Sequence, residues 1–119
     1  MAHILVVEDD LDLQFLYEAT LGRLGHVVTS AARTAEALVL LTHEEFDLVI
    51  LDMNMPDAPG IKVLQFARGD TRLNDVPIIV ISADAQWRRP CFDMGIEHFL
   101  IKPVPTRRLF ALLDELLPL

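Results

Sequence analysis

Four short apolar runs without polar alternation constrain the fold of this chain more than any other feature. A strand with one exposed face alternates apolar and polar side chains, whereas a parallel strand covered on both faces is apolar throughout. The runs are Ile4–Val7, Leu48–Leu51, Ile78–Ile81 and Phe99–Ile101. A weaker fifth strand is predicted over 26–30, after Gly25, which can end a preceding helix. The chain therefore favours a buried parallel sheet.

The segments between these runs carry helical patterns. Leucines recur at helical spacing from Leu13 to Leu24 and again from Leu109 to Leu117, so each stretch predicts an amphipathic helix. Less regular helices are predicted over about 34–43, 60–68 and 84–94. Strand and helix thus alternate five times, which predicts an α/β fold with a doubly wound five-stranded parallel sheet and helices on both faces.

Composition limits the classes of function. With 119 residues we expect one domain, 1–119, and no second domain. The formal charge of −8 disfavours direct binding of nucleic acid, which needs a basic surface. Cys91 is the only cysteine, so no intrachain disulfide forms, and no apolar run approaches the roughly 20 residues that span a bilayer. We expect a cytoplasmic protein without a membrane segment.

Polar residues follow the predicted strands at the points where the strands end. Glu8 and Asp9 follow the first strand, Asp52 the third, Ser82 the fourth and Lys102 the fifth. In doubly wound sheets, ligands bind outside the carboxyl ends of the strands, where the strand order reverses. Three carboxylates, a hydroxyl and an amine are therefore expected to meet at one edge.

Crowded carboxylates repel one another unless a cation neutralises them. Oxygen ligands without histidine or cysteine favour Mg²⁺, or Mn²⁺ in its place. Such a site can place a phosphoryl group beside a carboxylate nucleophile to form an acyl phosphate. Lys102 and the metal would neutralise the phosphoryl oxygens, and Ser82 would donate a hydrogen bond to one of them.

The chain resembles the response-regulator receiver domains of two-component signalling over essentially its whole length, with the flavodoxin-like fold of that family. The matching stretches are Ile4–Asp10, Asp47–Pro56, Ile81–Ala83 and Phe99–Pro103. By this resemblance Asp52 is the phosphoacceptor, and Asp9 and the backbone carbonyl of Asn54 join it as metal ligands. Glu8 is expected to act on the metal mostly through water.

The resemblance also implies a switch and partners. Ser82 and Phe99 are the expected switch pair, and the Lys102–Pro103 peptide bond is expected to be cis. A histidine kinase or a histidine phosphotransfer protein would donate the phosphoryl group. The face formed by the fourth helix, fifth strand and fifth helix would bind partners or a second receiver. The cognate kinase and the output are not implied, and a stand-alone regulator and a receiver from a longer chain both fit.

The chain departs from the usual receiver pattern at several positions. Glu8 stands where aspartate is frequent, Ser82 where threonine is common and Phe99 where tyrosine is common, and these residues keep the expected roles. The segment from 82 to 95 is about two residues short, and Pro90 falls inside the expected fourth helix, where proline removes a hydrogen bond. The sequence therefore does not imply a shape for the face formed by the fourth helix, fifth strand and fifth helix.

Three other functions compete with the receiver interpretation. A phosphatase with an aspartyl nucleophile would carry a second acid two residues later, where this chain has Asn54. A flavodoxin-like electron carrier needs a phosphate-binding loop after the first strand, where this chain has acids. An interaction module with a receiver fold and no phosphorylation is the remaining alternative. We expect a phosphoacceptor domain and not an enzyme with a separate substrate.

Overall fold

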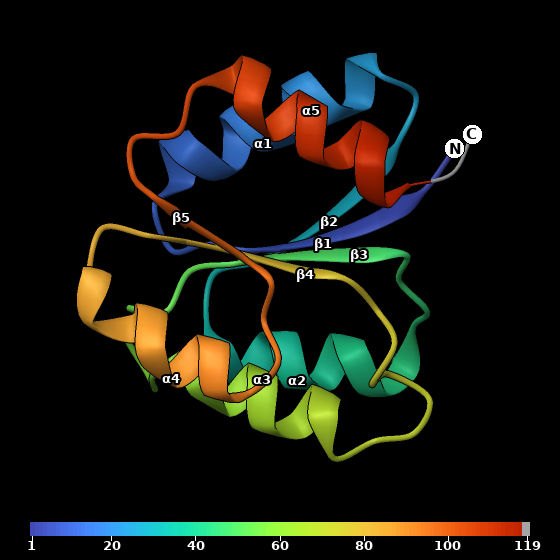
Figure 1. Cartoon of the computed structure of the whole chain (residues 1–119). Coiled ribbons are helices and arrows are strands. Elements are labelled where there is room, and N and C mark those ends of the chain that lie inside the picture. The colour runs from blue at the N-terminus through green and yellow to red at the C-terminus, as the bar shows by residue number, and fades with distance from the viewer. Residues whose placement is uncertain (118–119) are drawn as a thin grey trace.

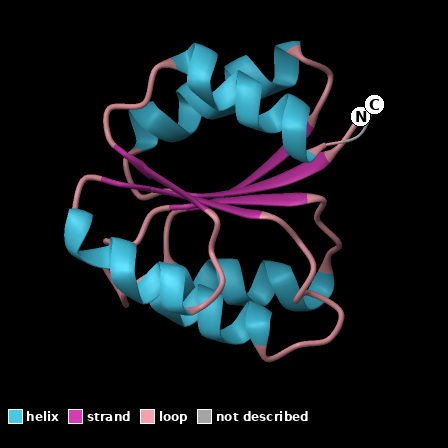
Figure 2. Cartoon of the chain, in the orientation of Figure 1, coloured by secondary structure: helices cyan, strands magenta, loops and turns pink. Residues whose placement is uncertain are grey.

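The computed structural model describes residues 1–117 as one five-stranded sheet between two layers of helices (Figures 1 and 2). The elements in chain order are β1 (His3–Val7), α1 (Leu11–Arg23), β2 (Val27–Ala31), α2 (Thr34–His43), β3 (Leu48–Leu51), α3 (Ile61–Arg68), β4 (Ile78–Ser82), the 3₁₀ turn η1 (Ala85–Trp87), α4 (Arg88–Asp93), β5 (His98–Ile101) and α5 (Thr106–Leu116). The alternation of strands and helices predicted from the sequence is confirmed.

All neighbouring strands are parallel, and their order is β2-β1-β3-β4-β5. Helices α1 and α5 cover one face of the sheet, and α2, α3 and α4 cover the other (Figure 1). The strand order reverses between β1 and β3, because the chain builds outward to β2 on one side and then to β4 and β5 on the other. The carboxyl ends of β1 and β3 therefore adjoin at the switch point of a doubly wound sheet.

Successive side chains of each central strand point into two different cores. In β1, Leu5 and Val7 join the core beneath α2, α3 and α4, whereas Ile4 and Val6 join the core beneath α1 and α5. All four are fully buried or nearly so. A strand covered on both faces has no polar side, which explains the continuous apolar runs of the sequence.

An acidic side chain caps one helix on each side of the sheet. Asp10 is the N-cap of α1, and its Oδ1 accepts hydrogen bonds from the backbone N–H groups of Asp12 and Leu13 at 3.0 and 3.2 Å. Helix α2 is capped from a remote loop, because the Asp57 carboxylate accepts from the N–H groups of Thr34 and Ala35, each at 2.9 Å. These bonds satisfy N–H groups that have no partner inside the helix. Asp57 thereby fixes the loop after β3 to the start of α2.

Pro90 lies in a helix that is shorter than the sequence predicted. The segment expected to be one helix over 84–94 consists of η1 followed by α4, which has only six residues. Pro90 is the third residue of α4, within the first turn, where backbone N–H groups have no carbonyl partner four residues earlier in the α-helix. The proline is tolerated because α4 begins just before it.

Within residues 1–117, none of the helices combines the length and apolar character that crossing a membrane requires.

We expect Asp57→Ala to lower the melting temperature at neutral pH, because it removes the acceptor of two N–H groups. The hydrogen bonds from Ala35 and Thr34 lower the pKa of Asp57 in the folded state. This contribution is therefore present above the pKa of the unfolded chain and is lost as the pH falls through the folded-state pKa. Thermal unfolding followed by circular dichroism should show a gap between variant and parent that closes on acidification. Asp75→Ala, at an exposed position, is the control, and a gap that widens in acid would contradict the cap.

Candidate functional site

Three carboxylates meet at the carboxyl ends of β1 and β3. Glu8, Asp9 and Asp52 each place a carboxylate oxygen within 4.8 Å of the other two. Glu8 and Asp52 are only 2% and 7% exposed, whereas Asp9 faces solvent. Parallel pairing sets Val7 beside Leu51, so the residues that follow them emerge at the same edge. The sequence prediction that these acids cluster is thus matched by the geometry.

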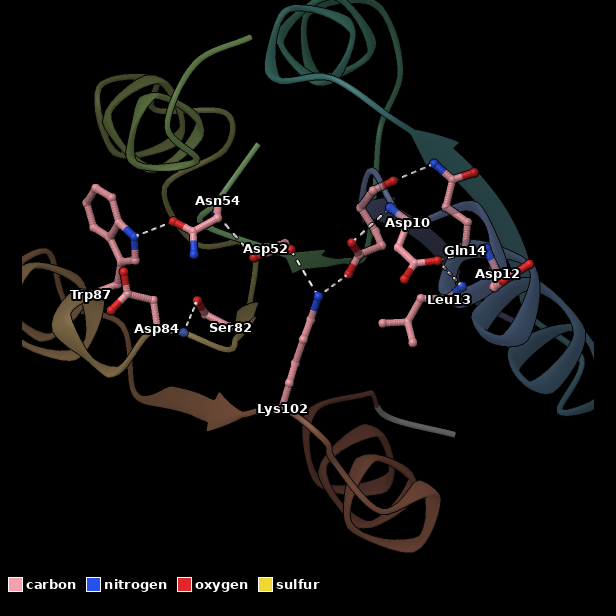
Figure 3. A network of polar contacts seen from close by, with 11 residues as sticks. Asp10, Asp12, Leu13, Gln14, Asp52, Asn54, Ser82, Asp84, Trp87 and Lys102 are labelled. Carbon is pink, nitrogen blue, oxygen red and sulfur yellow. Dashed lines mark hydrogen bonds and ion pairs between the residues drawn. The ribbon is translucent and has the colours of Figure 1, made fainter. Parts of the chain in front are cut away.

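The Lys102 ammonium joins two of these carboxylates, and Figure 3 shows its contact with Asp52. Its Nζ donates to Oε1 of Glu8 at 2.8 Å and to Oδ2 of Asp52 at 3.0 Å. Burial acts to lower the pKa of Lys102, but hydrogen bonds from the ammonium to both carboxylates and their negative charges outweigh it and raise the pKa. Lys102 is therefore a fixed positive charge at the site. The peptide bond that follows it, to Pro103, is cis.

One lysine does not balance the negative charge of the cluster. Burial raises the pKa of Glu8, and repulsion by Asp52 acts in the same direction against the hydrogen bonds from Lys102 and from the N–H of Asp10. Three carboxylates face a single ammonium among the residues at this edge. A divalent cation with oxygen ligands would complete the neutralisation, and the donor set of carboxylates and a backbone carbonyl suits Mg²⁺.

Backbone groups orient the two buried carboxylates. The N–H of Asp10 donates to Oε2 of Glu8 at 3.1 Å, and the N–H of Asn54 donates to Oδ1 of Asp52 at 3.1 Å. The amide of Gln14 in α1 donates to the backbone carbonyl of Glu8 at 2.7 Å and fixes this loop to the helix. Both buried carboxylates are therefore held by one backbone donor and by Lys102.

Ser82 ends β4 and is fully buried. Its Oγ accepts a hydrogen bond from the N–H of Asp84 at 3.1 Å (Figure 3). A serine hydroxyl donates one hydrogen bond and accepts two, so its proton remains available to a ligand. The N–H of Lys102 donates to the Ser82 carbonyl at 3.0 Å, which ties the end of β5 to the end of β4.

The aromatic side chain at the expected switch position is half-buried in β5. The guanidinium of Arg88 lies over the Phe99 ring, 5.0 Å from its centroid. Phe99 lacks the hydroxyl of the tyrosine that is common at this position, so its orientation depends on packing. A cation–π contact adds to that packing, because the positive charge is attracted to the face of the ring.

Close packing positions the loop that carries Asp52. The N–H of Gly60 donates to the Met53 carbonyl at 2.8 Å. A Cβ at Gly60 would lie 2.5 Å from the Asp52 carbonyl oxygen and 2.9 Å from the Met53 Cα. Only a residue without a side chain fits this approach of α3 to the loop.

Sequence reasoning missed several residues that position the site. Gln14, Gly60 and Trp87 belong to no recognisable motif of the sequence. The indole N–H of Trp87 donates to Oδ1 of Asn54 at 3.0 Å. Cys91 is fully buried, and burial raises the pKa of its thiol to about 11, so it serves as a packing residue.

The model of the response regulator receiver domain family matches residues 4–114. The chain belongs to this family. It is accordingly a phosphoacceptor signalling domain with an acidic pocket at Glu8, Asp9 and Asp52, and not a conventional enzyme.

Individual relatives agree with the family assignment. The transcriptional regulatory protein GltR of Pseudomonas aeruginosa is 36% identical over 96% of this chain and 48% of its own length. The chain thus spans about half the length of that relative. The response regulator TrrA of Thermotoga maritima, solved in complex with Mg²⁺ and BeF, is 28% identical with a TM-score of 0.87, covering 98% of this chain and 100% of that one.

A third similar protein is the receiver domain of a sensor histidine kinase from Pseudomonas aeruginosa. It is 28% identical with a TM-score of 0.88, covering 97% of this chain and 96% of that one. Its structure has a magnesium ion coordinated in the active site cleft. Transcriptional regulators and sensor kinases therefore both contain domains similar to this chain.

We expect Gly60→Ala to destabilise the protein by about 1–3 kcal/mol, the usual cost of forcing atoms into a packed site. Gly22→Ala is the matched control, because nothing lies within 4 Å of a Cβ there and alanine favours helix by up to about 1 kcal/mol. Urea unfolding of both variants measures the difference. Equal stability of the Gly60 variant and the parent would contradict the close approach.

Proposed function

We propose that Asp52 is the phosphoacceptor of this receiver domain. Its carboxylate lies at the end of a central strand, and one oxygen pairs with Lys102 while the other accepts from the Asn54 N–H. The contact of the Lys102 ammonium with Asp52 carries the proposal, because it places a positive charge where phosphoryl oxygens would gather. Asp9 is solvent-exposed, and Glu8 is turned to Lys102 and the Asp10 N–H.

Asp9, Asp52 and the backbone carbonyl of Asn54 would bind Mg²⁺ or Mn²⁺, and Glu8 would contribute through water. These oxygen donors fit a hard cation that keeps several waters. The bound ion would neutralise phosphoryl oxygens beside the nucleophile. The structures of TrrA and of the sensor-kinase receiver, which hold magnesium, support this assignment by similarity.

The chain's own residues suffice for the remaining roles in phosphoryl transfer. An Asp52 oxygen attacks the phosphorus, and the bond from phosphorus to the donor breaks as the donor leaves. Lys102 stabilises the charge on the phosphoryl oxygens, and the Ser82 hydroxyl donates a hydrogen bond to one of them. Membership of the family indicates a histidine kinase or a histidine phosphotransfer protein as the donor.

Asp52→Asn should abolish phosphorylation, because an amide is not a nucleophile for phosphorus at this site. The protein is incubated with Mg²⁺ and a small acyl phosphate, and intact mass spectrometry detects the added phosphoryl group. The parent and the exposed-site control Asp75→Asn should gain one group, and the parent in excess chelator should gain none. A phosphoryl group that persists in Asp52→Asn under native conditions would contradict the assignment.

Phosphorylation is expected to change the face formed by α4, β5 and α5. A phosphoryl group would draw the Ser82 hydroxyl inward, and Phe99 would move into the vacated space. This movement would break the contact of the Phe99 ring with Arg88. Two apolar side chains on this face are already exposed to solvent, Phe92 to 70% and Ile101 to 38%. A hollow there is lined by Arg88, Phe92, Phe99 and Arg108, among others. A partner or a second receiver would bind at this face.

Amide chemical shifts of the apo and beryllofluoride-treated protein test this switch. We expect perturbations beyond the Asp52 pocket, reaching residues 84 to 110, and expect Ser82→Ala to confine them to the pocket. Ser82→Ala should still accept some phosphoryl group, because Asp52 and Lys102 remain. Perturbations that never leave the pocket in the parent would disprove the output route.

A further inference from the structure

Trp87 connects the two loops that flank the phosphoacceptor. It ends η1, five residues after Ser82, and its indole N–H donates to the side-chain carbonyl of Asn54 at 3.0 Å. Asn54 in turn donates its backbone N–H to Asp52 at 3.1 Å. Figure 3 shows this series of contacts running from the indole to the carboxylate. A single residue, Asn54, therefore lies between Trp87 and the Asp52 carboxylate.

The contact fixes the orientation of the Asn54 amide. An indole nitrogen only donates, and of the two polar ends of an asparagine amide only the carbonyl accepts, so Oδ1 must face Trp87. In Figure 3 this carbonyl is turned toward Trp87, on the side away from Asp52. The indole itself is half-buried and packs against the core beneath α2, α3 and α4, which restrains its position.

The orientation of the Asn54 side-chain carbonyl bears on the rate at which an aspartyl phosphate at Asp52 is hydrolysed. In hydrolysis, a water oxygen bonds to phosphorus, the bond from phosphorus to the Asp52 oxygen breaks, and the carboxylate leaves with the electron pair. Inorganic phosphate is released, and the water proton passes to phosphate or solvent. A carbonyl on the rim of the pocket can orient that water by accepting a hydrogen bond from it.

We propose that Trp87 is a positioning residue that prolongs the phosphorylated state. It does so by holding the side-chain carbonyl of Asn54 away from the water that attacks phosphorus. The inference rests on Asp52 as phosphoacceptor and adds a determinant of how long the phosphoryl group remains. The indole N–H donates to the side chain of Asn54 and not to a carboxylate, so Trp87 acts through Asn54.

Trp87→Phe tests the inference, because phenylalanine retains an aromatic ring and removes the N–H. Protein phosphorylated with Mg²⁺ and a small acyl phosphate is separated from the donor, and the loss of phosphoprotein is followed by intact mass. We expect hydrolysis to be about fivefold faster, the effect of one neutral hydrogen bond. Asn54→Ala, which keeps the backbone carbonyl and N–H, should hydrolyse no faster than the parent, because the orienting carbonyl is absent.

The double variant completes the cycle. If Trp87 acts through Asn54, Trp87→Phe in the Asn54→Ala background should add no acceleration. An unchanged rate in Trp87→Phe, an equal acceleration in the Asn54→Ala background, or an acceleration by Asn54→Ala alone would each overturn the inference. A parent that accepts no phosphoryl group at all would instead overturn the proposed function, and this inference with it.

Fluorescence gives a readout that needs neither phosphate nor metal. Trp87 is the only tryptophan in the sequence, so its emission reports on this one indole. Asn54→Ala should shift the emission maximum of the apo protein, whereas Asp75→Asn should leave it unchanged. Identical emission spectra of Asn54→Ala and the parent would show that the contact does not form in solution and would overturn the inference.

Discussion

The pairing of one ammonium with two buried carboxylates is the interaction on which the site depends. Lys102 follows β5, Asp52 follows β3 and Glu8 follows β1, so a single Nζ joins the ends of three strands. Buried charges are tolerated only when they are paired and hydrogen-bonded. With Asp9 added, the cluster keeps an excess of negative charge, which a divalent cation would neutralise.

The strand order explains the chemistry of the neighbouring positions. Because β4 lies between β3 and β5, the Lys102 side chain must reach across the end of β4 to meet Asp52. A long side chain such as that of lysine spans this distance. Ser82 occupies the end of β4, is fully buried and supplies a hydroxyl there. The strand order thus determines the reach that the lysine side chain needs.

Much of the fold and of the acidic site was predictable, because both follow from local patterns. Continuous apolar runs mark buried parallel strands, and parallel strands bring the residues after them to one edge. The missed features depend on contacts between remote segments. The cap of α2 comes from Asp57, more than twenty residues later, and the bond from Trp87 to Asn54 crosses 33 positions. Residue type alone gives no signal for such pairs. The helix predicted over 84–94 is wrong in its first residues, which form the 3₁₀ turn η1, because such a turn has no distinct sequence pattern.

Magnesium-dependent stabilisation tests the central claim, that strand ends assemble a carboxylate cluster completed by a divalent cation. A ligand that binds only the folded protein raises its melting temperature by mass action. Calorimetry in millimolar MgCl₂, against NaCl of equal ionic strength, should show a higher melting temperature for the parent and for Asp75→Asn. Asp9→Asn, which removes the same charge from the cluster, should lose most of that increase. No increase in the parent, or the same increase in Asp9→Asn, would contradict the account.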